Sequence, residues 1–175
     1  MTARLAVIMI VVASLLVGGG LYYAQVYAYY DEVSLAEAGG VTALDRVTGE
    51  PREIAVSGFQ GIDSDSSPIR FRACFDTGIR ADDLAWAVPA EDAVPLIAPG
   101  WFDCFDAEEI GPALEAGQAQ AWIARRNAPY GIDRILALAP DGRGWMWTQI
   151  NECGTAVFDG ELPPEGCPEA PEEFR

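Results

Sequence analysis

The chain has 175 residues, of which 27 are acidic and 11 are basic, and its net charge is −16. A surface this acidic repels phosphate backbones, which excludes nucleic-acid binding. All the basic residues are arginine and no histidine occurs, so the chain lacks Ser-His and Cys-His catalytic pairs, histidine metal sites, P-loops and lysine Schiff bases.

Residues 5–24 form an uncharged apolar run, and the first ionised side chain after Arg4 is Asp31. About 20 residues in a helix cover about 30 Å, the thickness of the hydrocarbon core of a bilayer. Arg4 and the amino terminus are the only positive charges before the run, and such flanks stay in the cytoplasm. We therefore predict a membrane-spanning signal-anchor over residues 1–30 in a bacterial inner membrane. The N-terminus would be cytoplasmic and the following domain periplasmic.

A cleaved signal peptide is the alternative, with residues 5–17 as its apolar core and cleavage after Ala28. The apolar run is longer than the about 7–15 residues of a typical core. Tyrosines also gather where the helix would leave the membrane, as they do in an interfacial aromatic belt. These are Tyr22, Tyr23, Tyr27, Tyr29 and Tyr30. Both observations favour a retained anchor.

Three consecutive glycines, Gly18, Gly19 and Gly20, lie within the apolar run. Small residues let membrane helices approach one another closely, so this segment is a candidate packing face for a partner helix. A flexible exit of the chain from the bilayer is the other interpretation, because glycine weakens a helix. The sequence does not decide between the two.

After the anchor we predict a tether over residues 31–40, one α+β domain over residues 41–160 and an irregular Pro- and Glu-rich tail over residues 161–175. Alternating apolar residues predict a strand over residues 69–76. An Asp-Gly-Arg-Gly turn between apolar runs predicts a hairpin within an antiparallel meander. The remaining predicted elements are paired strands 41–47 and 53–59, a loop 61–67, short helices 82–87 and 107–116, meander strands 118–125, 132–139 and 145–150, and an edge strand 155–158.

Cys74, Cys104, Cys153 and Cys167 all follow the predicted anchor. An even number of cysteines in an oxidising compartment indicates disulfides. No CxxC occurs, so neither a thioredoxin-type motif nor a zinc ribbon is supported. Of the three connectivities we favour Cys74–Cys104 and Cys153–Cys167, which join segments close in sequence. A four-cysteine metal site is the alternative.

The predicted strand over residues 69–76 places Arg70 and Arg72 on one face, where two guanidinium groups could clamp an anion or a carboxylate. In so acidic a domain, pairing with neighbouring Asp or Glu is the competing interpretation. Trp145 and Trp147 share one face of their own predicted strand. An exposed tryptophan pair would mark a protein- or sugar-binding surface, whereas core packing of at least one is the alternative.

Two acidic clusters are weaker candidates. Asp63, Asp65 and Ser67 resemble the start of a calcium loop, but Pro68 stands where an EF-hand needs its glycine. The second cluster offers carboxylates for glycoside hydrolysis, which needs a pair about 5–9.5 Å apart. Its members are Asp103, Asp106, Glu108 and Glu109. A solvated loop and a helix cap, respectively, are the simpler interpretations.

Four stretches resemble an uncharacterised family of bacterial proteins that have one N-terminal span and an extracytoplasmic domain. They are PIRFRACF (68–75), APGWFDCFDA (98–107), YGIDRILAL (130–138) and NECGTAVFDG (151–160). The resemblance implies the same topology. It carries no known activity, so no functional residue can be transferred from it.

Because conventional catalytic residues are missing, we expect a non-enzymatic protein without a cofactor. A single span and a disulfide-linked domain favour an accessory, assembly or scaffold protein of an envelope or respiratory membrane complex. Its partner would be an integral membrane or periplasmic protein. An extracytoplasmic domain that binds a small molecule or calcium is the alternative, and a carboxylate-dependent hydrolase is the third hypothesis.

Overall fold

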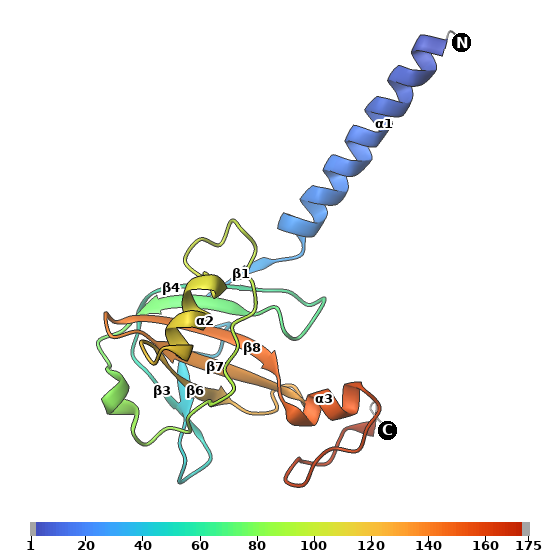
Figure 1. Cartoon of the computed structure of the whole chain (residues 1–175). Helices are drawn as coiled ribbons and strands as arrows, with labels where there is room; N and C mark the ends of the chain where they lie inside the picture. The colour runs from blue at the N-terminus through green and yellow to red at the C-terminus, as the bar shows by residue number, and fades with distance from the viewer. Residues whose placement is uncertain (1–2, 173–175) are drawn as a thin grey trace.

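A computed structural model describes residues 3–172, so Met1, Thr2 and residues 173–175 of the predicted tail lie outside the described residues. Helix α1 (Ala3–Tyr23) projects from the domain as a single rod, and a π-helical turn, η1 (Ala24–Ala28), continues it (Figure 1). No side chain of α1 is buried. Together α1 and η1 are long and apolar enough to cross a membrane, which confirms the predicted apolar helix.

A six-stranded antiparallel sheet forms the centre of the domain. Its strands, from edge to edge, are β1 (Asp31–Val33), β4 (Ser57–Asp63), β5 (Arg72–Asp76), β8 (Arg143–Ile150), β7 (Ile132–Leu138) and β6 (Gln120–Arg125). The other elements are a small hairpin of β2 (Thr42–Leu44) and β3 (Pro51–Glu53), a 3-10 helix η2 (Ala81–Leu84), and the helices α2 (Ala107–Glu115) and α3 (Glu152–Phe158). This confirms the predicted α+β fold and the meander β6–β7–β8.

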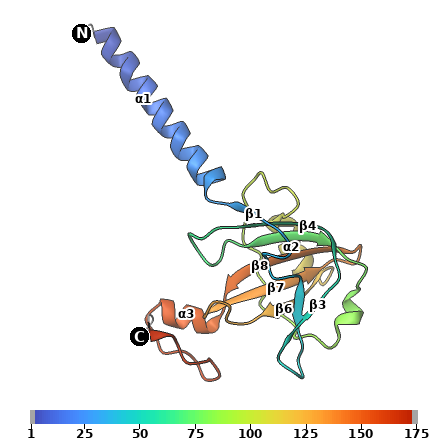
Figure 2. The ribbon, with the colours of Figure 1, turned by 180° about the vertical axis from the view of Figure 1, so that it is seen from behind.

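Both faces of the sheet are covered. The β2–β3 hairpin and η2 lie against one face, and α2 with the segment 98–107 lies against the other (Figures 1 and 2). Buried side chains therefore alternate between two cores along a strand, as in β8, where Met146 enters the first core and Trp145 and Trp147 enter the second. This arrangement buries the middle of the sheet on both sides.

Three predicted elements differ in type or pairing from the observed ones, while the predicted helix 82–87 is only the 3-10 turn η2 and the predicted strand 69–76 is shortened to β5. Residues 31–33, expected to be part of a tether, pair with β4 as an edge strand. The first hairpin is shorter than predicted, because β3 ends at Glu53 and residues 57–63 belong to the main sheet. The segment 155–158, predicted as an edge strand, is the end of helix α3. Each difference reflects contacts with distant segments.

Helix α3 begins at Glu152 because residues earlier in the chain hold its N-cap residue, Asn151, in place. Asn151 Oδ1 accepts a hydrogen bond from the Gly154 amide at 2.9 Å, which satisfies a free N–H of the first turn. Asn151 Nδ2 donates to the buried Asp133 carboxylate at 2.6 Å. Gly154 lies directly against Gly131, and a Cβ there would clash with the Gly131 carbonyl. These contacts override the strand preference of the β-branched residues that follow.

The two disulfides have the predicted connectivity. Cys74–Cys104 ties strand β5 to the segment 98–107, and Cys153–Cys167 ties α3 to the tail. Within residues 161–172 the tail has no regular element beyond an isolated 3-10 position near its end, as expected for a Pro- and Glu-rich stretch. The first disulfide thus holds the segment 98–107 against the sheet, whereas the second holds the C-terminal tail against α3.

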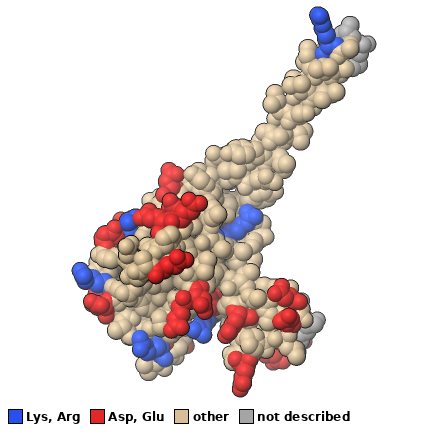
Figure 3. All heavy atoms as spheres, in the orientation of Figure 1, with Lys and Arg blue, Asp and Glu red and all other residues tan. Residues whose placement is uncertain are grey.

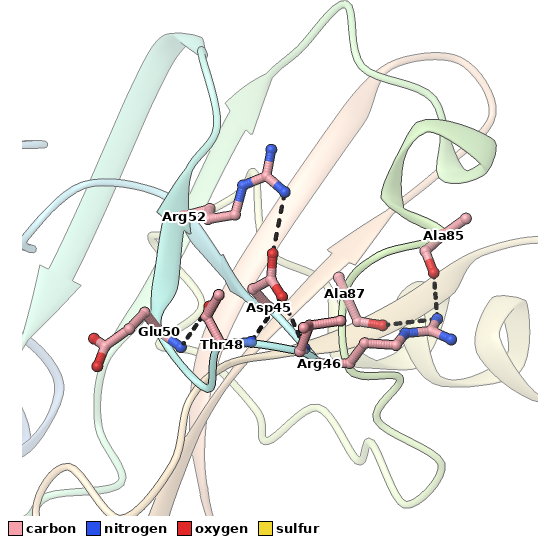
Figure 4. A network of polar contacts seen from close by, with 8 residues as sticks. Asp45, Arg46, Thr48, Glu50, Arg52, Ala85 and Ala87 are labelled. Atoms are coloured by element: carbon pink, nitrogen blue, oxygen red, sulfur yellow. Dashed lines mark hydrogen bonds and ion pairs between the residues drawn. The ribbon is translucent and has the colours of Figure 1, made fainter.

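A polar network fastens the β2–β3 hairpin to the chain after η2 (Figure 4). The Asp45 carboxylate accepts hydrogen bonds from the Val47 and Thr48 amides at 2.8 and 3.1 Å and pairs with Arg52 at 3.1 Å. The Val47 amide chiefly lowers the pKa of Asp45. Arg46 donates to the carbonyls of Ala85 and Ala87. All these groups are used in holding the hairpin, so the network has a structural role.

Candidate functional site

Aromatic side chains join the end of the apolar helix to the domain. The Trp101 indole N–H donates to the Val26 carbonyl at 2.7 Å, a contact between residues 75 positions apart. The Trp101 ring stacks on Tyr27, with centroids 6.2 Å apart and an interplanar angle of 19°. Tyr30 meets the same ring edge-on at 6.3 Å. We call these four residues, together with Arg70, the anchor junction.

Very little chain separates the helix from the sheet. η1 ends at Ala28, and β1 begins at Asp31, which pairs with Asp63 of β4. A linker this short, with a stacked tryptophan and a paired strand beside it, leaves little freedom between helix and domain. The anchor junction therefore sets the orientation of the domain relative to α1 (Figure 1).

The two arginines of the predicted anion clamp have different environments. Arg72 is buried, with 3% of its surface exposed, and it donates to the carbonyls of Leu96, Ile69 and Phe71 at 2.7–2.9 Å. Burial lowers the pKa of Arg72 to about 10. Its Nε and Nη1 donate to backbone carbonyls and hold the loop around Leu96. Arg72 also lines the same pocket as Arg70, so the two-arginine clamp stays a prediction.

The guanidinium group of Arg70 remains available to bind an anion. Arg70 is half-buried, and its guanidinium lies 5.8 Å from the Tyr29 ring centre and 5.5 Å from that of Tyr30. Such contacts are cation–π interactions. Across residues 3–172, Arg70 has neither a hydrogen bond nor an ion pair. It is a cation at the anchor junction whose donors have no acceptor among the described residues.

Trp145 and Trp147 do not form a surface. Their exposed fractions are 4% and 0%, and both lie in the core beneath α2 and the segment 98–107. The Trp145 indole donates to the Cys104 carbonyl at 3.1 Å, and that of Trp147 donates to Gln149. The core-packing interpretation is therefore confirmed for both, and the exposed pair is wrong, because a distant segment covers the face that they share.

Gly18, Gly19 and Gly20 lie on the exposed surface of α1. A Cβ placed at any of them meets no atom within 4 Å. The helix is uncharged between the basic side chain near its start and the domain, while acidic side chains are spread over the domain (Figure 3). A packing role for the glycines stays a prediction, since the described chain itself places nothing against them.

Two of the four carboxylates considered for hydrolysis have structural partners. Asp106 caps α2 by accepting a hydrogen bond from the Glu108 amide at 2.8 Å, as the capping interpretation predicted. Glu109 pairs with Arg143 at 3.0 Å. Asp103 is exposed. Among the residues that the structure describes, no group of three His, Cys, Asp or Glu side chains is arranged to hold a metal ion.

Asp63, the first residue of the predicted calcium loop, gives a pH-dependent prediction. It is half-buried at the end of β4, and burial raises the pKa of its carboxyl despite a hydrogen bond from the Ser64 amide at 2.8 Å and the nearby Arg134 charge. The unfolded chain has an Asp pKa of about 3.9. Because the folded pKa of Asp63 is higher, this residue stabilises the folded state below about pH 3.9, and that stabilisation is lost as the pH rises through the folded pKa.

Asp63→Asn should therefore raise the melting temperature at pH 7 and leave it unchanged near pH 3.5. Thermal unfolding of the full-length protein in mild detergent between these pH values measures the effect. Asp65→Asn, at an exposed residue of the same loop, is the control and should change little. A lower melting temperature for Asp63→Asn at pH 7 would contradict the prediction and mean that Arg134 and Arg72 outweigh burial.

An apolar groove of about 620 Å³ lies between the loop after β4 and α3. Ile69, Pro129, Ile150 and Phe158 line it, and the last two are 41% and 44% exposed. Sequence reasoning missed this groove, since its walls come from segments far apart along the chain. No local pattern distinguishes these apolar residues from core residues.

The model of one protein family matches residues 41–168, well over half of the chain. The chain belongs to the DUF6446 family. This is a family of unknown function, which confirms the resemblance to a family without known activity. The DUF6446 match covers five of the six strands of the sheet, both disulfides, Arg70 and Trp101, and it begins after the helix and β1. Comparison with curated proteins and with solved structures found no match.

Proposed function

We propose that the protein is a non-enzymatic, membrane-anchored periplasmic accessory or scaffold protein that works through contact with a protein partner. The stiff anchor junction carries this proposal. A domain whose orientation is set by its own membrane helix can present one face repeatedly to a partner at a constant height. A flexible tether would suit a domain that searches for soluble ligands.

The anchor junction also supports retention of the helix rather than cleavage after Ala28. Cleavage there would remove the Val26 carbonyl and the Tyr27 ring from Trp101. It would also expose the indole and leave its N–H without this acceptor. A signal peptide that is to be discarded gains nothing from such contacts. In the proposed topology the amino terminus is cytoplasmic, and the DUF6446 domain faces the periplasm of a bacterial inner membrane.

Two surfaces fit a partner. The first is the glycine segment of α1, where a second membrane helix could approach closely because no side chain intervenes. The second is the acidic exterior of the domain, which has 27 acidic residues and would attract a basic protein surface. The partner is thus an integral membrane protein, or a basic periplasmic protein bound to one.

The test is purification of tagged full-length protein in mild detergent, with cross-linking and mass spectrometry. We expect a stoichiometric membrane partner that is lost when Gly18, Gly19 and Gly20 are all replaced by leucine. Replacing Val11, Val12 and Ala13 by leucine is the matched control on the same helix and should keep the partner. A wild-type protein without any stoichiometric partner, or one that lacks residues 1–28, would overturn the proposal.

A second candidate function is binding of an apolar small molecule in the groove beside α3. The observation in its favour is that Ile150, which lines this groove, is 41% exposed. A ligand would raise the melting temperature of the wild-type protein, since binding stabilises the folded state. The variant Ile150→Ser should lose that rise, and a flat ligand screen would remove this candidate.

A further inference from the structure

A second pocket opens at the anchor junction itself. It has a volume of about 490 Å³ and lies between the end of the helix and the loop 96–100. Val26 and Tyr30 contribute the helix side, Ile97 and Pro99 the loop side, and Arg70 the domain side. The membrane anchor therefore forms one wall of this pocket.

Two arginines, Arg70 and Arg72, line the pocket, and none of its described lining residues is acidic. The domain from residue 31 onward has 27 acidic residues and 10 arginines. Other arginines donate side-chain hydrogen bonds to this chain, namely Arg46, Arg52, Arg72, Arg125, Arg134 and Arg143. Arg70 is half-buried against Tyr29 and Tyr30, and within the described chain it has no acceptor. Partial burial of an unpaired charge is unfavourable, so this site favours an anion from outside.

The position of Arg70 relative to the membrane indicates which anion would bind there. Residues 5–24 cover about 30 Å as a helix and so fill the hydrocarbon core of a bilayer. Gln25 and Val26, which line the pocket, then lie in the layer of lipid phosphates. Arginine binds phosphate with two parallel hydrogen bonds, a geometry that suits a group at this depth.

The loop 96–100 is built to meet the bilayer. Ile97 at its tip is 77% exposed and lies beside the outer end of the membrane helix. The loop is held in place by Arg72, whose Nε donates to the Leu96 carbonyl at 2.8 Å. An exposed isoleucine on a fixed loop at the membrane surface gains by entering the apolar region between lipid chains.

We propose that this pocket binds the phosphate of a phospholipid from the outer leaflet of the membrane, with Arg70 as the donor and Ile97 inserted among the acyl chains. The inference rests on the retained anchor of the proposed function. The bound lipid fills the space between helix and domain, and it adds a third contact to those made by Trp101 and β1.

Native mass spectrometry of the full-length protein in mild detergent tests the site, with phosphatidylglycerol and phosphatidylethanolamine added separately. The wild type should retain one phospholipid per chain. Arg70→Gln should reduce the retained fraction at least about tenfold, which corresponds to about 1.4 kcal/mol. Arg70→Lys should retain an intermediate amount, because lysine keeps the charge without the two-pronged geometry.

Two matched controls locate the effect. Arg126→Gln removes the same charge from an exposed arginine that does not line this pocket, and it should retain lipid as the wild type does. Ile97→Asp should lose lipid, whereas Val94→Asp, at an exposed residue of the same segment outside the pocket, should not. Unfolding temperatures of all variants separate loss of lipid from loss of fold.

Three results would overturn the inference. The first is equal lipid retention by Arg70→Gln and the wild type. The second is displacement of the lipid by millimolar inorganic phosphate, which would make Arg70 a site for free phosphate. The third is an intact mass showing that residues 1–28 are missing, which removes the anchor and the proposed function as well. A retained anchor with a bound partner but no Arg70 effect would refute only the lipid site.

Discussion

Trp147→Ala should lower the free energy of unfolding by about 3–5 kcal/mol, the usual cost of removing a fully buried large aromatic side chain. Trp147 has no exposed surface, and it lies on β8 between Arg72 of β5 and Ile135 of β7. Its ring meets Phe105 edge-on, with centroids 6.1 Å apart. Removing it opens a cavity between the sheet and the segment that covers it.

Urea unfolding of the full-length protein in mild detergent, followed by circular dichroism, measures the effect. Trp86→Ala is the matched control, because Trp86 is only half-buried and stacks under Arg52 at 4.0 Å. We expect its cost to be well under half of that for Trp147. If Trp147→Ala left the stability unchanged but abolished binding of the partner protein, Trp147 would be a residue of the binding surface and not of the core.

Loss of the Cys74–Cys104 disulfide should cost about 2–5 kcal/mol, and more than loss of Cys153–Cys167. Chain entropy alone contributes roughly 3–4 kcal/mol for closed loops of either length, so it hardly distinguishes the two. The difference comes from what each disulfide holds. Cys74–Cys104 secures the cover over Trp145 and Trp147, whereas Cys153–Cys167 secures a peripheral tail.

The double variants Cys74→Ala/Cys104→Ala and Cys153→Ala/Cys167→Ala test this difference, and each serves as the control for the other. The first double variant should unfold at a clearly lower urea concentration than the second. The second should show early proteolysis confined to the tail, with the midpoint less affected. Equal midpoints would mean that the segment 98–107 stays on the sheet without its disulfide.

Local patterns predicted the meander and the helix cap well. Strands β6, β7 and β8 follow one another with tight turns, so their periodicity and the Asp-Gly turn contain most of the information needed. The Asp106 cap and Gly117, with φ at +66°, likewise bound α2 as local rules predict. The disulfide pairing followed from short separations along the chain.

Long-range contacts explain the errors. Trp145 and Trp147 are candidate surface residues because their strand alternates, but alternation does not reveal that a distant segment covers the face that they share. The start of α3 depends on Asp133 and Gly131, which lie about 20 residues upstream of its cap. The sequence shows a cluster of tyrosines after the apolar run but not its contact with Trp101, which lies 75 positions away from Val26.

If the helix is a membrane anchor, as proposed, its direct join to the sheet limits how the domain can meet a partner. For a chain anchored as proposed, the domain cannot bend toward a target independently of the helix. Any tilt of the helix therefore moves the whole domain with it. The motions that remain are tilt of the helix, lateral diffusion and rotation about the membrane normal. Encounters then take place in two dimensions, and a partner must offer its binding surface at one distance from the bilayer.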